Sequence, residues 1–277
     1  MGFSLTRLFR RGGPVVPVVR MSGAIGVGMT FRQGLSLSGI EGALERAFAI
    51  KAAPAVAILI NSPGGSAVQS HLIFKRIRAL AEQKGKRVVV GVEDVAASGG
   101  YMIALAGDEI VVDQSSIVGS IGVVFAGFGF PKLLDKIGIE RRVHTAGESK
   151  VILDPFQKEK VEDVARLEAL QGEVHAAFID LVKTRRGAAL KDDPDLFTGA
   201  FWSGGRAVQL GLADEIGDLR EALRRRFGEK VVLRTVAAER GFFRRRFGLT
   251  GGRDAGALLR GLVAVIEERL LWSRFGL

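Results

Sequence analysis

Apolar runs of strand length alternate with helical patterns along most of this chain. Apolar residues fill 55–60 without interruption, and 87–92 is nearly as apolar. Such runs are typical of strands that are buried on both faces of a parallel sheet. In 38–50 the apolar residues recur at i, i+4, i+7 and i+8, which predicts a helix with one buried face. The alternation predicts an α/β fold, a mostly parallel sheet with flanking helices and right-handed crossovers.

The same patterns place the remaining elements. Further strands are expected at 15–21, 109–112, 140–144 and 231–236, and a loop running into a strand at 115–124. Further helices are expected at 67–84, near 130–137, from about 156 to 181, and at 203–211, 219–227 and 257–275. The predicted organisation is a basic N-terminal arm (1–13), one α/β domain (14–236), a basic Gly-rich linker (237–256) and a C-terminal helix (257–277).

The composition of the chain excludes several kinds of site and one class of binding partner. The 277 residues include no cysteine, which excludes disulfides, thiolate metal sites and a cysteine nucleophile. The three histidines, His71, His144 and His175, are too scattered to suggest a metal site. The net charge is +10, but the arginines concentrate towards both ends without an aromatic platform, so we expect no nucleic-acid binding. We expect no cofactor and no metal.

The sequence offers no uncharged apolar run long enough for a transmembrane helix and no signal-peptide pattern. We therefore expect a protein that is cytoplasmic or peripheral on the inner face of the cytoplasmic membrane. The first thirteen residues and the 257–275 helix combine apolar and basic residues. Either segment could contact a membrane surface, and the helix could equally pack against protein.

The candidate for covalent chemistry lies between an apolar strand and an apolar helical segment. There, Ser98 is followed by Gly99 and Gly100. At such a point a serine hydroxyl can be exposed while backbone N–H groups point at a substrate oxygen. A serine before a helix is also a common N-cap that only satisfies backbone donors. This stretch alone leaves both interpretations open.

A second turn of small residues, Ser62-Pro63-Gly64-Gly65, ends the 55–60 strand and opens a helix. Proline fixes one φ, and the glycines can adopt positive φ and let another backbone come close. The N–H of Gly65 is then free to donate. Two neighbouring parallel strands would place both turns at the same carboxyl edge of the sheet, where the sites of α/β proteins lie.

Several motifs, taken together and in order, resemble the signal peptide peptidase A (SppA, protease IV) family. They are Ser62-Pro63-Gly64-Gly65, Ala96-Ala97-Ser98-Gly99-Gly100-Tyr101, Gly119-Ser120-Ile121-Gly122-Val123, the loop at Lys150, Trp202-Ser203-Gly204 and the segment 211–217. The resemblance spans about residues 14–228. It implies a Clp/crotonase-like fold and a serine endopeptidase with a Ser–Lys dyad. Such an enzyme cleaves hydrophobic peptides, such as signal-peptide remnants or membrane-associated segments, through an acyl-enzyme.

The resemblance implies a role for each motif residue. Ser98 would be the nucleophile and Lys150 the general base. The N–H groups of Gly65 and Gly99 would form the oxyanion hole. Ser120 would donate or accept a hydrogen bond that orients Lys150.

A lysine serves as a base only when its amine is neutral, and its unperturbed pKa is about 10.4. Burial among apolar groups lowers that pKa, and Lys150 is followed by the apolar residues 151–153. His144 is a competing base, with Asp113 or Asp154 as the acid of a triad. Its position after two arginines, however, places it at the surface.

Short members of the resembled family assemble into rings or domes, in which the serine and lysine of one site can come from neighbouring chains. We expect such a homo-oligomer here, with active sites near subunit interfaces, because a single domain leaves the Lys150 loop little cover. His71, near the Gly64–Gly65 turn, could line the cleft or simply pack.

Two other functions stay open at this point. A crotonase-like acyl-CoA enzyme would keep the oxyanion hole but would need neither Ser98 nor Lys150. A non-catalytic, membrane-associated scaffold would leave the lysine unused.

Overall fold

The computed structural model describes residues 13–26, 34–147, 149–237, 266 and 269–277. The strands are β1 (Val15–Ser22), β2 (Ala55–Ser62), β3 (Arg87–Ala97), β4 (Glu109–Val112), β5 (Ile117–Gly119), β6 (Phe201–Ser203), β7 (Glu215–Ile216) and β8 (Val232–Thr235). The helices are α1 (Leu37–Ala49), α2 (Ala67–Lys84), α3 (Gly99–Ala104), α4 (Pro131–Ile137), α5 (Val161–Arg186), α6 (Gly204–Gln209) and α7 (Leu219–Phe227).

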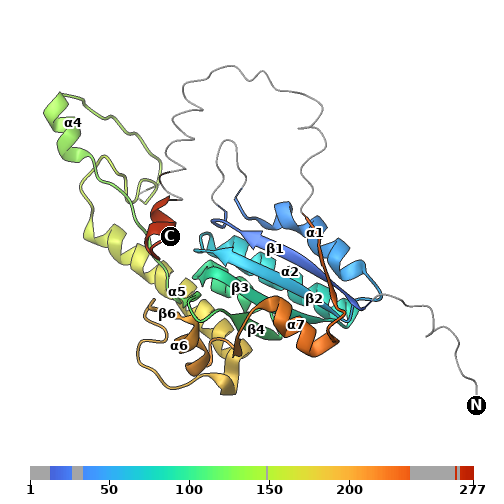
Figure 1. The fold of residues 1–277 in the computed structure, drawn as a ribbon. Coiled ribbons are helices and arrows are strands. Elements are labelled where there is room, and N and C mark those ends of the chain that lie inside the picture. The colour runs from blue at the N-terminus through green and yellow to red at the C-terminus, as the bar shows by residue number, and fades with distance from the viewer. Residues whose placement is uncertain (1–12, 27–33, 148, 238–265, 267–268) are drawn as a thin grey trace, which may run out of the picture.

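The strands form one eight-stranded sheet with helices on both faces (Figure 1). Its order is β6-β5-β3-β2-β1-β8. In addition, β4 pairs with the first half of β3, and β7 pairs with β4. Every pair is parallel except β5 and β6. The predicted mostly parallel α/β fold is therefore confirmed, and the arrangement is consistent with a Clp/crotonase-like fold.

The central strands are buried on both faces, which explains their uninterrupted apolar runs. Val88 and Val90 of β3 belong to the larger core, together with side chains from α1, α2 and α3. Val89, between them, points to a second core, to which α7 contributes Leu219 and Leu223. The side chains thus alternate between two cores with the period of a strand.

The helix over 38–50 is confirmed as α1, and the residues of its predicted apolar stripe are buried: Ile40, Leu44, Ala47 and Phe48. The helix at 67–84 is confirmed as α2. Its first turn is capped by the Ser66 side chain, which accepts from the N–H of Gln69, and it ends at Gly85, whose φ is 59°. Serine at the N-cap and glycine in the left-handed C-cap are the residues that these positions favour.

Two predictions were wrong in the middle of the chain. Residues 140–144 form no strand and are exposed, because no neighbouring strand offers them hydrogen-bond partners. The long helix begins at Val161 instead of near residue 156, and only Phe178 and Val182 of α5 are buried. The helix therefore reaches the core only in its second half.

Residues 123–160, which we call the projecting arm, contain no buried residue in their described part. Figure 1 shows this segment, with α4, extending away from the sheet. The predicted N-terminal arm and the Gly-rich linker lie almost entirely outside the described residues. Of the predicted 257–275 helix, the structure describes helical residues at 266 and 269–273. None of the helices in the described ranges is both long and apolar enough to cross a membrane.

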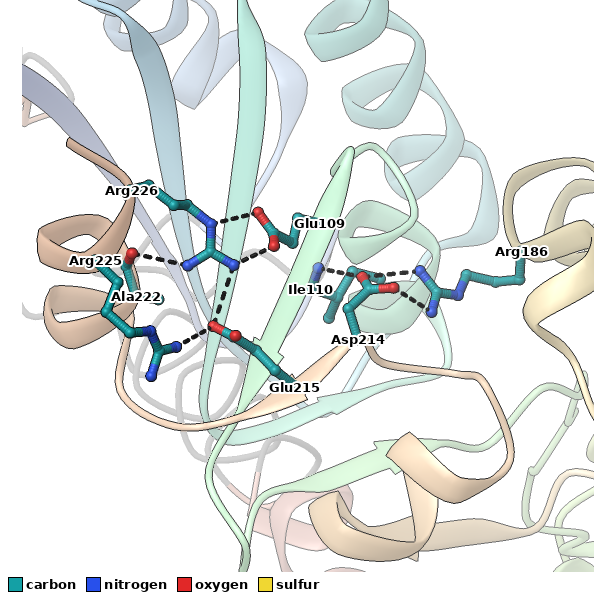
Figure 2. A network of polar contacts seen from close by, with 8 residues as sticks. All are labelled: Glu109, Ile110, Arg186, Asp214, Glu215, Ala222, Arg225 and Arg226. Carbon is teal, nitrogen blue, oxygen red and sulfur yellow. Dashed lines mark hydrogen bonds and ion pairs between the residues drawn. The ribbon is translucent and has the colours of Figure 1, made fainter.

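Ion pairs join α7 to the start of β4 (Figure 2). Arg226 contacts Glu109 through two nitrogens and Glu215 at 3.2 Å. Arg225 contacts the same Glu215 carboxylate at 2.9 Å. The carboxylate of Glu215 is shared between the two arginines, so β7 and α7 are held together at the edge of the sheet.

A second set of contacts in the same region holds the helix that follows Ser98. Asp214 accepts from both terminal nitrogens of Arg186, at 2.8 and 3.0 Å, and from the N–H of Ile110 at 2.7 Å. Two residues before it, the Leu212 carbonyl accepts from the Tyr101 hydroxyl at 2.9 Å. Tyr101 is fully buried on α3, and burial raises the pKa of its phenol. The turn 212–214 therefore fixes both α5 and α3.

Asp214→Ala should lower the free energy of unfolding by about 2–3 kcal/mol, because it leaves the buried Arg186 guanidinium without a counter-ion. The Arg186 side chain is only 8% exposed, whereas the Asp214 side chain is 34% exposed, which keeps the loss below that of a fully buried pair. Urea unfolding measures the effect. Glu140→Ala is the control, since Glu140 and Arg142 form an exposed pair. Equal urea midpoints for the two variants would contradict the assignment.

Candidate active site

Three adjacent parallel strands end at one edge of the sheet, and a turn follows each of them. The strands are β2, β3 and β5. The turns carry, in the same order, Gly64 with Gly65, Ser98 with Gly99, and Ser120. The structure thus brings four of the five predicted site residues to a single edge, as the strand order of a parallel sheet requires.

Ser98 lies in a strained turn between β3 and α3. Its φ is 51° and its ψ is −120°, a conformation that costs a non-glycine residue about 1–3 kcal/mol. Its side chain accepts no hydrogen bond from the first turn of α3, so Ser98 is not a simple N-cap. The half-exposed residue instead has the backbone of a nucleophile elbow, in which a sharp strand-to-helix turn presents the hydroxyl.

The strain is confined to the segments that carry the predicted site. Within the described ranges, three non-glycine residues have positive φ: Ser98, Ser120 at 53° and Leu153 at 55°. Leu153 belongs to the turn that includes Lys150. Residues in such conformations cluster at functional sites, where the surrounding structure holds them in place.

The Gly64 turn and the Ser98 turn are in direct contact. A Cβ added to Gly64 would lie 2.8 Å from the Ser98 Cβ and 2.9 Å from the Ala97 carbonyl oxygen. The φ of Gly64 is 105°, and that of Gly65 is 139°. A side chain at Gly64 would separate the two turns, which is why this position requires glycine.

Two backbone donors remain free beside Ser98. The bridge between Ile25 and the Gly64 turn uses the carbonyl of Gly64 and the N–H of Ser66, so it leaves the N–H of Gly65 unused. Gly99 is the first residue of α3, where helix N–H groups have no intrahelical partner. Neither N–H has an acceptor within the described part of the chain. Unpaired N–H donors next to a serine are the groups from which an oxyanion hole is built.

Two further serines contact these turns: Ser62, which belongs to the predicted motif, and Ser70, which the sequence did not single out. The Ser62 hydroxyl donates to the Gly23 carbonyl at 2.8 Å and accepts from the N–H of Gly64 at 3.3 Å. The Ser70 hydroxyl lies 2.2 Å from the point where a Cβ on Gly99 would sit. The sequence signal that could have identified Ser70 is a small polar residue at a buried position of α2.

Ser120 lies beside Ser98 with its hydroxyl available. Its N–H donates to the Ala200 carbonyl at 2.7 Å, and the carbonyl of the preceding Gly119 accepts from the N–H of Ser98 at 2.8 Å. Ser120 is 6% exposed, and its hydroxyl has no hydrogen-bond partner among the residues that the structure describes. It is therefore free to orient another polar group at this edge.

The structure places Lys150 on the projecting arm. The residue is exposed, residues 151–153 beside it are only half-buried, and no described hydrogen bond or ion pair joins its ammonium to Ser98 or Ser120. The expectation that Lys150 is buried among these apolar neighbours is not met within one chain. The candidate base and the candidate nucleophile thus stand on different parts of the fold.

The histidines do not provide an alternative base. His144 is exposed on the projecting arm. The ring of His71 stacks on Phe74, and burial lowers its pKa. His175 on α5 lies with its Nε2 3.0 Å from the Ile121 carbonyl, so it is half-buried in a contact of its own. Each histidine has a packing or surface role that the structure shows directly.

A strained serine beside two free N–H groups, at the carboxyl edge of an α/β sheet, is the arrangement that a serine hydrolase needs. The family model of peptidase family S49 matches residues 80–232. This chain therefore belongs to peptidase family S49, the class of serine peptidases that the sequence motifs predicted.

Relatives of this chain carry different names. A putative protease of Synechocystis sp. is 32% identical over 81% of this chain and 81% of its own length. Protease 4 of Haemophilus influenzae is 33% identical over 75% of this chain and 34% of its own length. A Brucella abortus protein named Na(+)/H(+) antiporter NhaA is 57% identical over 99% of this chain. This chain spans only 38% of that longer protein.

Gly64→Ala should slow peptide hydrolysis by more than about tenfold, equivalent to about 1.4 kcal/mol in the activation barrier, because the methyl group pushes the Ser98 turn out of place. Gly85→Ala is the matched control. Gly85 also has a positive φ, 59°, but a Cβ there meets no atom within 4 Å. Its activity per folded molecule should equal that of the unmodified chain. Equal activity of the two variants would show that the contact between the turns is not needed.

Proposed function

We propose that this chain is a serine peptidase with a Ser98–Lys150 dyad that cleaves hydrophobic peptide segments through an acyl-enzyme. The observation that carries the proposal is the strained turn at Ser98 with the free N–H groups of Gly65 and Gly99 beside it. Membership in peptidase family S49 favours this reaction over acyl-CoA chemistry and over a scaffold role.

The reaction follows from these groups. The neutral amine of Lys150 takes the proton of the Ser98 hydroxyl, and the oxygen attacks the carbonyl carbon of the scissile peptide bond. The negative charge that develops on the carbonyl oxygen is stabilised by the N–H groups of Gly65 and Gly99. The C–N bond then breaks, the amine leaves with the proton from Lys150, and water hydrolyses the ester on Ser98.

Ser98→Ala should abolish labelling by a fluorophosphonate probe, and Lys150→Ala should slow it by about 10²–10⁴-fold, the usual contribution of a general base. Lys158→Ala, which removes another exposed lysine of the projecting arm, is the control and should label at the original rate. Labelling is followed by intact-protein mass spectrometry. A Lys150→Ala variant that reacts as fast as the control would refute the dyad.

The base must also be shielded from water, and the single chain does not do this. The projecting arm exposes large apolar side chains, among them Phe128 at 77%, Val124 at 68% and Phe125 at 56%. The first half of α5 adds Val161 at 81%. Exposed apolar patches of this kind mark interaction surfaces.

We propose that a second copy of this chain covers the projecting arm in a closed homo-oligomer. The arm carries Lys150 but no nucleophile, and the sheet edge of a copy carries Ser98 with an unpartnered Ser120 hydroxyl. Docking the arm of one copy at the sheet edge of the next would complete the site. It would also desolvate the Lys150 amine, which favours its neutral form.

Mixing the inactive Ser98→Ala and Lys150→Ala variants after dissociation and reassembly should restore activity. In a closed ring with random assembly, about a quarter of the sites would combine an intact serine with an intact lysine from different copies. Peptidase activity and light scattering are measured on the same samples. Mixed oligomers without any activity would show that both residues of a site come from one copy.

Phe128→Asp should disrupt the assembly, since it places a charge in the buried interface. Light scattering should then report smaller species with little peptidase activity. A fully active monomer would contradict the proposed assembly.

A further inference from the structure

The segment 119–121, which carries Ser120 along the serine edge, is held in a strained conformation. Ser120 has a φ of 53°, and the preceding Gly119 has a φ of 110°. The carbonyl of Gly119 accepts from the N–H of Ser98 at 2.8 Å, and the N–H of Ser120 donates to the Ala200 carbonyl at 2.7 Å. A non-glycine residue keeps such a backbone only where its surroundings hold it. The contacts of this segment therefore decide where the Ser120 hydroxyl lies.

A further contact to the segment comes from α5. Nε2 of His175 lies 3.0 Å from the carbonyl oxygen of Ile121, and this carbonyl has no other hydrogen-bond partner in the part of the chain that the structure describes. A carbonyl oxygen can only accept, so Nε2 carries the proton and donates it. Ile121 is completely buried. Its carbonyl would therefore be costly to leave without the imidazole as donor.

His175 also stands where the projecting arm joins the domain. The arm, residues 123–160, begins two residues after Ile121 and ends where α5 begins. His175 lies three residues before Phe178, the first buried residue of α5, so the two side chains share the face of the helix that packs on the core. Phe178 and Ile121 belong to the same core. The hydrogen bond to Ile121 therefore ties the helix at one end of the arm to the segment at its other end.

The other polar contacts of α5 do not hold this segment. Arg185 donates to the Leu105 carbonyl, and Arg186 donates to the Gly211 carbonyl, both from the C-terminal end of the helix. Between α5 and the segment, the hydrogen bond of His175 has no second among the described residues. Removing its donor would therefore loosen the segment without releasing the helix.

We infer that His175 is a positioning residue of the proposed peptidase, which holds the segment 119–121 in place. The Ser120 hydroxyl that this segment carries can then meet the Lys150 amine of the assembled enzyme. This inference rests on the proposed dyad. His175 takes no proton in this role, since its N–H stays in the hydrogen bond to the segment and no bond to the imidazole forms or breaks. A misplaced orienting hydroxyl slows the chemical step and leaves the binding of the peptide unchanged.

His175→Ala should lower kcat for an apolar peptide by about tenfold, the effect of one ordinary hydrogen bond, with KM unchanged. His175→Gln should restore most of kcat, because its amide nitrogen is as many bonds from the main chain as Nε2 and can donate to the same carbonyl. His175→Asn is the matched control: its amide is one bond shorter, so it should behave like His175→Ala. The constants are measured on the assembled enzyme, with urea midpoints and light scattering to compare folding and assembly.

A double-mutant cycle tests whether His175 acts through Ser120. In a Ser120→Ala background, His175→Ala should slow the labelling of Ser98 by a small fluorophosphonate less than about threefold, against about tenfold alone, because the hydroxyl that it positions is absent. Equal effects in both backgrounds, or His175→Gln no more active than His175→Asn, would overturn the inference. Should His175→Ala fold poorly, the comparison of His175→Gln with His175→Asn decides. If Ser98 of the unmodified chain is not labelled at all, the peptidase proposal itself fails.

Discussion

The contact between the Gly64 turn and the Ser98 turn is the constraint on which the candidate site depends. The two turns can approach only because Gly64 has no side chain, and their approach sets the free N–H groups of Gly65 and Gly99 beside one serine. An oxyanion hole works by holding its donors in place before charge develops, so that no reorganisation is needed during the reaction. The strained backbone of Ser98 has the same origin, since β3 must turn sharply into α3 at the edge of the sheet.

The rest of the domain opposes the relaxation of that strain. Tyr101 ties α3 to the Leu212 carbonyl, and the Arg186–Asp214 pair ties the same turn to α5. The Tyr101 contact is buried and the Arg186 side chain is nearly so, and such contacts hold one geometry because a displaced partner would be left unsatisfied. A series of contacts distant from Ser98 in sequence therefore supports the position of its hydroxyl.

The exposed apolar side chains of the projecting arm and the small apolar patch formed by Val95, Ala97 and Ile117 pose the same physical problem. Exposed apolar surface is covered by whatever apolar surface is close by, because the hydrophobic effect is not directional. The arm has no cover within one chain, whereas the patch has Phe275. In the proposed assembly, a second copy would cover the arm at the edge where Ser98 lies.

Local patterns in the sequence were enough for the strands and helices of the sheet domain, because periodicity, Ser66 at an N-cap and the glycine turns act over a few residues. They also identified the motifs of the site and its family. They could not show that residues 140–144 lack a strand partner, that half of α5 is unpacked, or that Ser70 supports Gly99. The position of the Lys150 loop away from Ser98, and of Phe275 beside Ala97, was likewise decided only by the tertiary structure. These outcomes depend on which distant segments share a surface, and strand pairing and apolar burial fix that only when the whole chain is folded.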